Sequence, residues 1–251
     1  MEFDSVMKIG LPSGDAVDLF LGETKLWPPM RVFVEKGQLI KIDLNGDVTK
    51  ETYRVIKVNG TIAEILAMAN ASSSKFGSNQ TYAGSTLDNY LNNTWYNTLS
   101  ATAKSAIVNK TFRQDSWHWN NSGNPVYSGY YGSSNPGTTA YTISLGNASF
   151  GAEITRHVYA LSVQDVLDYI LDTNITDGKL QNYNIWKMFW NRTSNISEQP
   201  WLRSADAPTP SDAFHVYGGT GHVGSDGVTD SRVSRPALTI DLSKIEYEIV
   251  E

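Results

Sequence analysis

The spacing of hydrophobic and polar residues predicts strands in the first part of the chain. Between residues 31 and 68, runs rich in β-branched residues are separated by the dipeptides Asn45-Gly46 and Asn59-Gly60. Asn-Gly between two such runs is a strong signal of a β-hairpin. We therefore expect strands at Arg31–Val34, Gln38–Ile42, Tyr53–Val58 and Ile62–Met68.

Helical spacing begins at Ser85. The residues Ser85-Thr86-Leu87-Asp88 resemble a capping box, and an apolar stripe follows as far as Leu99. We expect a second helix at Ala101–Val108 and a third at Val163–Leu171, the latter opened by Ser162 three residues before Asp165.

The N-terminal segment, residues 1–29, is expected to be separate from a main domain at residues 30–251. Apolar and polar residues alternate around Gly22-Glu23, and Pro28-Pro29 then ends the pattern. This arrangement predicts a short hairpin followed by a linker. An isolated hairpin is marginally stable in water, so Phe20, Leu26 and Trp27 should pack on the main domain or on a neighbouring chain.

Residues 115–150 mix aromatic side chains with Gly, Ser, Asn and Pro. Antibody loops have a similar composition, because rigid rings supply contact area and small polar residues supply hydrogen bonds. On this interpretation the segment is a binding loop with Trp117, Trp119 and Tyr130 as ligand-binding residues. The alternative is a loop that covers the core with its own aromatic side chains.

The C-terminal part holds Trp201-Leu202-Arg203-Ser204 and, after a polar stretch, Arg235-Pro236-Ala237-Leu238. These elements resemble a family of bacterial and phage proteins of unknown function that looks like the C-type-lectin fold. The resemblance extends over roughly residues 33–242. It implies an α+β, C-type-lectin-like domain with a small N-terminal β appendage.

The motif itself is interpreted as framework. Trp201 and Leu202 have the character of core residues, and Arg203 and Arg235 could hold loop carbonyl groups with their guanidinium forks. Specificity would then lie in the enclosed stretch, residues 205–234, because loops on a rigid scaffold carry binding function. The candidate ligand-binding residues there are Asp206, His215, Tyr217, His222 and Asp226.

Leu19–Trp27 is similar to a phrase found near the start of phage minor tail proteins. The resemblance implies a phage tail-tip or tail-fibre protein of the virion that recognises a host-surface glycan or protein without catalysis. Other tail subunits, or sister copies in a homo-oligomer, would be its partners. A bacterial surface or secreted adhesin with the same domain is the alternative.

Charge and cysteine content narrow the function classes. The net charge is −6, and Lys and Arg occur without runs, so we expect neither nucleic-acid binding nor membrane insertion. Cysteine is absent, which excludes disulfides and thiolate metal sites. It also excludes the cysteine chemistry of the formylglycine-generating enzymes, which share the C-type-lectin fold.

The hypotheses of an enzyme or a metal site depend on acidic and histidine residues. A glycoside hydrolase would need two facing carboxylates, for which Asp206 with Asp212 or Asp226 with Asp230 are the candidate pairs. No Gly-x-Ser-x-Gly element or zinc-type histidine spacing occurs. We therefore expect no enzyme and no cofactor; calcium is the one ion that the Asp and Asn oxygens would suit.

Overall fold

The computed structural model describes residues 20–21, 24–25, 34–119, 127–131, 139–171, 179–180, 188–189, 199–217 and 222–250. The chain divides into two compact units, Met1–Val34 and Glu35–Glu251. In the first unit, β1 (Phe20–Leu21) pairs antiparallel with β2 (Thr24–Lys25), on either side of the expected Gly22-Glu23 turn. The expected strand Arg31–Val34 lies outside the described residues, apart from Val34.

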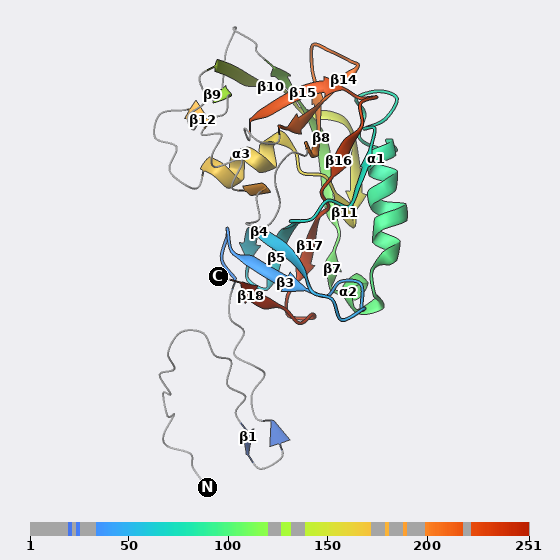
Figure 1. The fold of residues 1–251 in the computed structure, drawn as a ribbon, viewed down its shortest axis with the longest axis vertical. Helices are drawn as coiled ribbons and strands as arrows, with labels where there is room; N and C mark the ends of the chain where they lie inside the picture. Colours follow the sequence, from blue (N-terminus) through green and yellow to red (C-terminus); the bar gives the residue numbers. More distant parts are fainter. Residues whose placement is uncertain are drawn as a thin grey trace. The chain divides into compact units, whose positions relative to one another are not determined.

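The first large sheet of the second unit combines the β-rich sequence at residues 39–67 with strands from much later in the chain. Its described strands run in the order β11-β17-β5-β4-β3-β18, and β7 also pairs with β17. Figure 1 shows this sheet beside the chain's C-terminus. The bounds are β3 (Leu39–Ile42), β4 (Glu51–Asn59), β5 (Ile62–Ala67), β7 (Ile107–Val108), β11 (Val158–Tyr159), β17 (Ala237–Asp241) and β18 (Glu248–Val250).

Three of the predicted strands are confirmed in this sheet. β3 and β4 pair antiparallel with Ile40 opposite Tyr53, and β4 and β5 pair with Val55 opposite Ile65. The β4–β5 turn falls at Gly60, whose φ of +61° is a backbone conformation that favours glycine.

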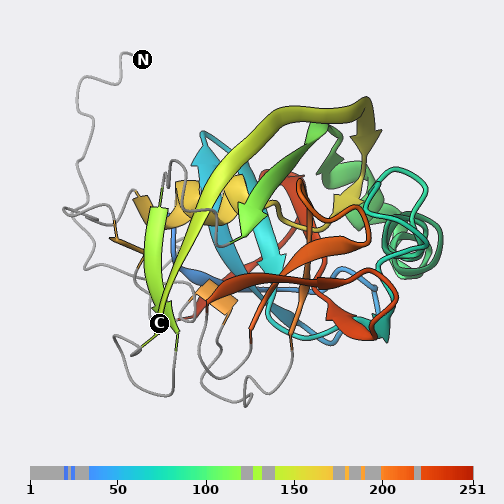
Figure 2. The same ribbon diagram turned by 90° about the horizontal axis from the view of Figure 1, so that it is seen from above.

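The second large sheet has the described order β12-β9-β10-β8-β13-β14-β15. β8 and β10 form a long curved pair that arches over the unit in Figure 2. The bounds are β8 (Lys110–Trp119), β9 (Tyr127–Tyr131), β10 (Thr139–Arg156), β12 (Lys179–Leu180), β13 (Trp201–Asp206), β14 (Asp212–Val216) and β15 (Val223–Gly227). A small separate pair joins β6 (Ser72–Ser74) to β16 (Arg232–Ser234).

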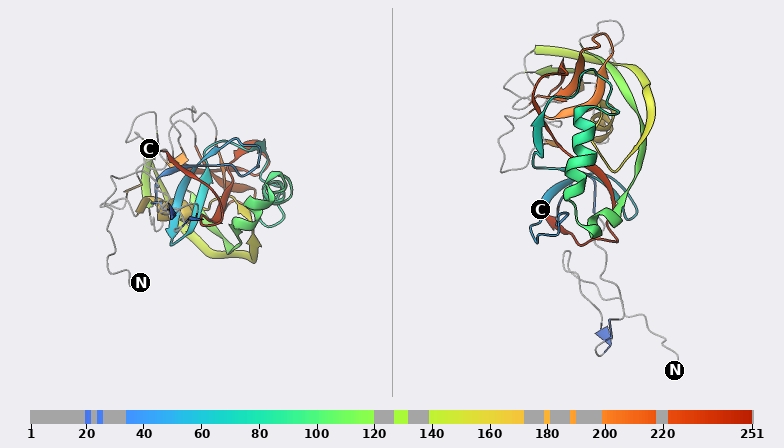
Figure 3. Two further views of the ribbon diagram at one scale, coloured as in Figure 1. Left: turned by 90° about the horizontal axis from the view of Figure 1, so that it is seen from below. Right: turned by 90° about the vertical axis from the view of Figure 1, so that its right-hand side faces the viewer.

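Helices are short and lie where the sequence predicts them. The right-hand view of Figure 3 shows one helical segment in front of the second unit, formed by α1 (Thr86–Asn89), a π-helix (Tyr90–Trp95) and a 3-10 turn (Tyr96–Thr98). α2 (Ala101–Ala106) stops before the predicted Val108, because Ile107 and Val108 join the sheet as β7.

The third helix, α3 (Val163–Leu171), has the predicted bounds and the predicted cap. The Ser162 amide donates to Asp165 Oδ2 over 2.9 Å, and the Asp165 amide donates to Ser162 Oγ over 3.0 Å. These reciprocal bonds satisfy two amide donors at the start of the helix. The buried side chains of Val166, Leu167 and Ile170 join one core cluster with residues of both large sheets.

The expected fold class is wrong. The second unit is mostly β, in several largely antiparallel sheets with only short helices, and is not an α+β C-type-lectin-like domain. The error came from two segments that were interpreted as loops. Residues 115–150 contain much of β8–β10, and residues 205–234 contain β14, β15 and β16. In both segments aromatic residues, which suit strands, occur among the turn-forming residues that suggested loops.

Candidate functional site

The Trp201-Leu202-Arg203-Ser204 motif is a fully buried strand, β13. Trp201 and Leu202 are each 1% exposed, so their predicted place in the core is confirmed. The Trp201 indole also donates to the carbonyl oxygen of Ser74 over 3.1 Å. The motif therefore joins the second sheet to the core and to the chain near β6.

Arg203 ties β13 to the start of α3. Its Nη1 donates to the Ala160 carbonyl oxygen over 2.7 Å and to Asp165 Oδ2 over 2.5 Å. The guanidinium carbon lies 4.4 Å from the ring centre of Phe112. The predicted contact of this arginine with a loop carbonyl is confirmed.

Arg235 makes a similar connection at the other end of the signature. Its Nη1 donates to the carbonyl oxygen of Phe189, and its Nε donates to Asn70 Oδ1 over 2.8 Å. Phe189 and its neighbour Met188 are buried in the core, and Arg54 Nε donates to the Met188 carbonyl oxygen over 3.0 Å. Two arginines thus fix one short buried segment by its backbone.

Four of the predicted binding residues come together: His215 of β14 and Tyr217 contact the carboxylate of Asp226 of β15, and His222 stacks on Tyr217. Asp226 Oδ2 lies 3.0 Å from His215 Nε2 and accepts from the Tyr217 hydroxyl over 3.1 Å. The guanidinium of Arg232, from β16, also donates to Oδ2. The Asp226 side chain remains 32% exposed. We call Asp226, His215, Tyr217, His222 and Arg232 the Asp226 cluster.

Aromatic rings form a row through this cluster. The Tyr217 and His222 rings stack with their centres 4.1 Å apart at 15°, and the His215 and Tyr217 centres are 4.2 Å apart. Trp119 of β8 continues the row beyond His222, at 6.0 Å and 26°, and Trp201 lies 6.0 Å from His215 on the core side. The row therefore leads from the core to the half-buried rings of Trp119 and Tyr217.

Burial and charge set the protonation of the cluster. Burial lowers the pKa of His222 to about 4, and the neighbouring His215 acts in the same direction. Burial also lowers the pKa of His215, whereas the hydrogen bond from His215 holds the pKa of Asp226 below its ordinary value. At neutral pH the cluster therefore contains two neutral histidines and a carboxylate facing the Arg232 guanidinium.

The remaining predicted residues lie elsewhere. Trp117 is 1% exposed, and its indole donates to Asp115 Oδ2 over 2.8 Å, so it belongs to the core. Asp206 is 3% exposed and accepts from Ser225 Oγ over 2.8 Å. Burial raises the pKa of Asp206. Tyr130 lies in β9, and its side chain is outside the described residues.

Sequence reasoning missed Arg232 as a member of the cluster. Its guanidinium binds Asp226 and lies 5.3 Å from the ring centre of Trp201. The only signal in the sequence was a basic residue shortly before Arg235, and nothing in the spacing showed that the β16–β6 pairing would bring it over β13.

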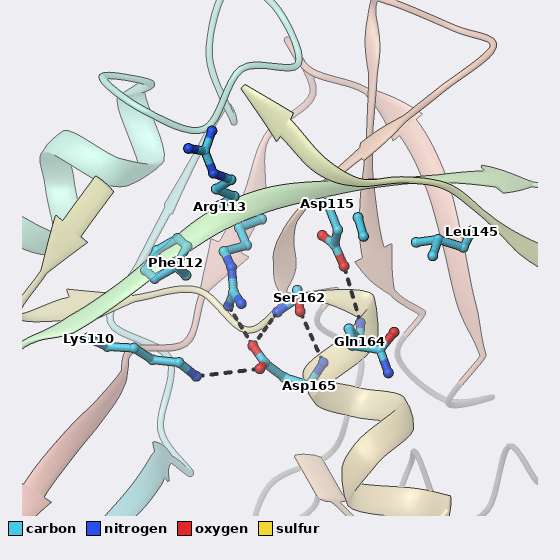
Figure 4. A pocket seen from close by; sticks show the side chains of 10 residues that line it. Lys110, Phe112, Arg113, Asp115, Leu145, Ser162, Gln164 and Asp165 are labelled. Atoms are coloured by element: carbon cyan, nitrogen blue, oxygen red, sulfur yellow. Dashed lines mark hydrogen bonds and ion pairs between the residues drawn. The ribbon is translucent and has the colours of Figure 1, made fainter. Parts of the chain in front are cut away.

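A second polar site lies at the start of α3. A cavity of about 250 Å³ is bounded by β8, β10, α3 and β13, as Figure 4 shows for Lys110, Phe112, Asp115 and Asp165. Asp115 accepts from the Trp117 indole and, over 2.5 Å, from Ser204 Oγ. Phe112, Leu145 and Ala148 give this cavity an apolar wall.

The described residues contain neither a clustered metal-ligand set nor a membrane-spanning helix. No group of three or more His, Asp or Glu side chains there is arranged to hold a metal ion. In that same part of the chain, no helix combines the length and apolar character that crossing a membrane requires.

Comparison with known proteins gives one family. The family model described as "Domain of unknown function (DUF6273)" matches residues 59–242. Those residues run from the end of β4 past the end of β17 and include both the Asp226 cluster and the cavity beside α3. Neither the curated proteins nor the solved structures gave a match.

Proposed function

The chain belongs to the DUF6273 family of unknown function, and we propose that it is a non-catalytic recognition protein of a phage tail that binds a host-surface glycan or protein. The observation that carries this proposal is the Asp226 cluster. The half-buried rings of Trp119 and Tyr217 belong to one row of aromatic rings, and the Tyr217 hydroxyl donates to the partly exposed Asp226 carboxylate. Aromatic area beside a fixed hydrogen-bond acceptor is a common basis of ligand recognition.

The cluster is rigid, which favours binding. Tyr217 closes over Gly224 so tightly that a Cβ atom at residue 224 would lie 2.6 Å from Tyr217 Cε2. The Tyr217 amide also donates to the His222 carbonyl oxygen over 2.8 Å. Side chains that are fixed before the ligand arrives lose little entropy on binding.

The charges around Asp226 support binding over glycoside hydrolysis. A hydrolase needs one carboxyl group held protonated near neutral pH. The pKa of Asp226 is lowered by its donors, and Arg232 faces both Asp226 and, at 4.0 Å, Asp230. Asp206 has a raised pKa but is almost fully buried and bonded to Ser225.

The assignment to a phage tail rests on the sequence of Leu19–Trp27 and on the order of the motifs between residues 33 and 242. In that setting several copies on one virion would raise the apparent affinity by multivalency. Weak binding by a single chain is therefore sufficient.

The experiment is attachment of the labelled, purified chain to a panel of bacterial strains and to a glycan array. We expect at least one strain or glycan to be bound, with binding weakened by Tyr217→Ala and retained by Tyr96→Ala. Tyr96 is a suitable control because its ring stacks on His157, away from the cluster. Binding that Tyr217→Ala leaves unchanged, or turnover of a bound glycan, would refute the proposal.

A further inference from the structure

The cavity beside α3 is separate from the Asp226 cluster. Its lining comes from β8, β10, α3 with its cap, and β13, and includes none of the residues of that cluster. The two long strands β8 and β10 are irregular here, with register shifts between Leu145 and Asn147 and between Asn147 and Phe150. These bulges leave Leu145 42% exposed at the rim of the cavity.

Two of the three cations of the lining, Arg203 and Lys110, are each closely paired with a carboxylate. Arg203 pairs with Asp165 over 2.5 Å, and Lys110 pairs with Glu64 over 2.9 Å. Arg113 is weakly paired, with its Nε 4.0 Å from Glu153. An anionic ligand would meet cations that already have carboxylate partners, and it would be repelled by those carboxylates. A cationic ligand would meet the reverse situation. This balance favours a neutral ligand.

The same groups leave acceptor positions for a ligand, together with one of the three N–H donors of Lys110, whose other two face Glu64 and Asp165. Asp165 accepts from Arg203, from the Ser162 amide and, at 3.5 Å, from Lys110, while a carboxylate has about four acceptor sites. Gln164 uses its amide nitrogen to bond Asp168 over 2.7 Å, and within the part of the chain that the structure describes its Oε1 accepts no hydrogen bond. A hydroxyl group both donates and accepts, so it can use both kinds of position.

Apolar residues of the lining complement its polar groups. Leu145 and Ala148 supply aliphatic surface, with Leu145 beyond Asp115 and Gln164 in Figure 4. Phe112 lies at the other end of the lining, where its ring packs against the Arg203 guanidinium. A ring that carries hydroxyl groups on its edge and C–H groups on its faces matches such a lining. The cavity volume of about 250 Å³ is below the range of about 300–1,000 Å³ typical of drug-sized ligands, which limits the ligand to a single ring.

From this arrangement we propose that the cavity beside α3 binds one neutral sugar ring, through Gln164, Asp165 and Lys110 on its hydroxyl edge and Leu145 and Ala148 on its C–H face. The inference extends the proposed recognition function and rests on it for its biological setting, but it concerns other residues. It therefore gives the chain a second contact with a host glycan, through residues other than Tyr217 and Asp226.

The test is a titration of the ¹⁵N-labelled full chain with methyl glycosides of glucose, galactose, mannose and N-acetylglucosamine, followed by NMR. Methyl glucuronide and acetate serve as charged probes. We expect at least one neutral glycoside to shift the Gln164 side-chain amide and the Ser162 amide, with a dissociation constant in the micromolar to millimolar range. The charged probes should shift them less.

Two matched variants test whether the glycoside binds in the cavity. Ala148→Trp fills the cavity, and Ala152→Trp puts the same side chain at an exposed position on the same strand, outside the lining. We expect Ala148→Trp to weaken glycoside binding by at least about tenfold and Ala152→Trp to leave it unchanged. Both positions are exposed, so neither variant should impair folding.

Three outcomes would overturn the inference. They are no shift with any neutral glycoside, tighter binding of methyl glucuronide or acetate, and binding that Ala148→Trp leaves intact. Failure of the proposed function is distinguishable, because it is read from cell attachment of the Tyr217→Ala variant. Glycoside binding that survives Tyr217→Ala supports two independent contacts.

Discussion

Arg203 of β13 and Asp165 of α3 form an ion pair with 2.5 Å between Nη1 and Oδ2, and both side chains are largely buried. The pair connects the Trp-Leu-Arg-Ser strand to the capping box of the helix. Arg203 and Lys110 keep the Asp165 carboxylate ionised, with its pKa well below the ordinary value despite burial. The signature arginine therefore determines how α3 is attached to the second sheet.

Replacing Arg203 with Met should destabilise the fold. It removes a cation from a buried carboxylate and leaves the Ala160 carbonyl oxygen without that donor, which should cost about 3–5 kcal/mol in unfolding free energy. Urea denaturation measures the loss. In this variant the charge partner that Asp165 keeps among the described residues is the more distant Lys110, at 3.5 Å. Adding Asp165→Leu removes the poorly compensated carboxylate, together with its capping bond to the Ser162 amide, and should restore part of the stability; a double variant no better than Arg203→Met would contradict this account.

Trp201→Ala should also act through stability. The side chain is 1% exposed and packs against Phe76, with ring centres 5.6 Å apart. Truncating a buried aromatic residue costs about 3–5 kcal/mol. Trp95→Ala is the matched control, since Trp95 is only partly buried and should lose less. A stable Trp201→Ala protein that no longer binds its ligand would mean that Trp201 contacts ligand and is not framework.

Gly224→Ala tests whether the position of Tyr217 matters. The added Cβ would lie 2.6 Å from Tyr217 Cε2, so the ring must move and its bond to Asp226 should be lost. We expect weaker ligand binding and a stability loss of about 1–3 kcal/mol. Gly227→Ala is the control on the same strand, because its nearest contact is an ordinary 3.6 Å to Asp230. Equal effects of the two variants would disprove the role of the Tyr217 contact.

Stability should fall in mildly acidic solution. The folded protein lowers the pKa of His222 from 6.5 to about 4, so the unfolded chain takes up this proton first as the pH falls. The stabilisation by neutral His222 is complete above about pH 6.5 and is lost between about pH 6.5 and 4, a change of about 3 kcal/mol. Buried His215 acts in the same direction.

His222→Phe keeps a ring against Tyr217 and removes this titration. Unfolding free energies measured between pH 4 and 7 should therefore vary less for the variant than for the natural chain. Asp226 and Asp165, whose pKa values are lowered, lose their stabilising contribution at more acidic pH and should account for the remaining slope. Parallel pH profiles for the two proteins would contradict the assignment to His222.

The sequence predicted local elements well. The strands β3, β4 and β5 follow from β-branched runs and Asn-Gly turns, and α3 follows from Ser162 and Asp165 three residues apart. Helix α2 was predicted too long, because β-branched Ile107 and Val108 suit a strand once β17 is beside them. The local sequence pattern predicts the Asn-Gly turns and the Ser162–Asp165 cap, but it does not show which distant strand will pair with a given segment.

The fold class could not be obtained in this way. Whether the aromatic residues of 115–150 form strands depends on pairing with β13, which lies far away in sequence, as in the parallel pair Ala205 with Ser116. His215 shows that the burial of a candidate site residue also depends on distant parts of the chain. The sequence suggested a ligand-binding histidine, but the structure buries it completely, so its effect on a ligand would pass through Asp226.

The most direct test of ligand recognition at the Asp226 cluster is a binding titration of the natural chain and Tyr217→Ala on a strain or glycan that the natural chain binds, with unfolding free energies measured in parallel. Tyr217 is only half-buried, and Arg232 and His215 still face Asp226 without it. We predict at least about tenfold weaker binding, with a stability loss clearly smaller than the loss of about 3–5 kcal/mol expected for Trp201→Ala. Unchanged affinity, or a loss of binding that only follows a loss of folding, would contradict the account.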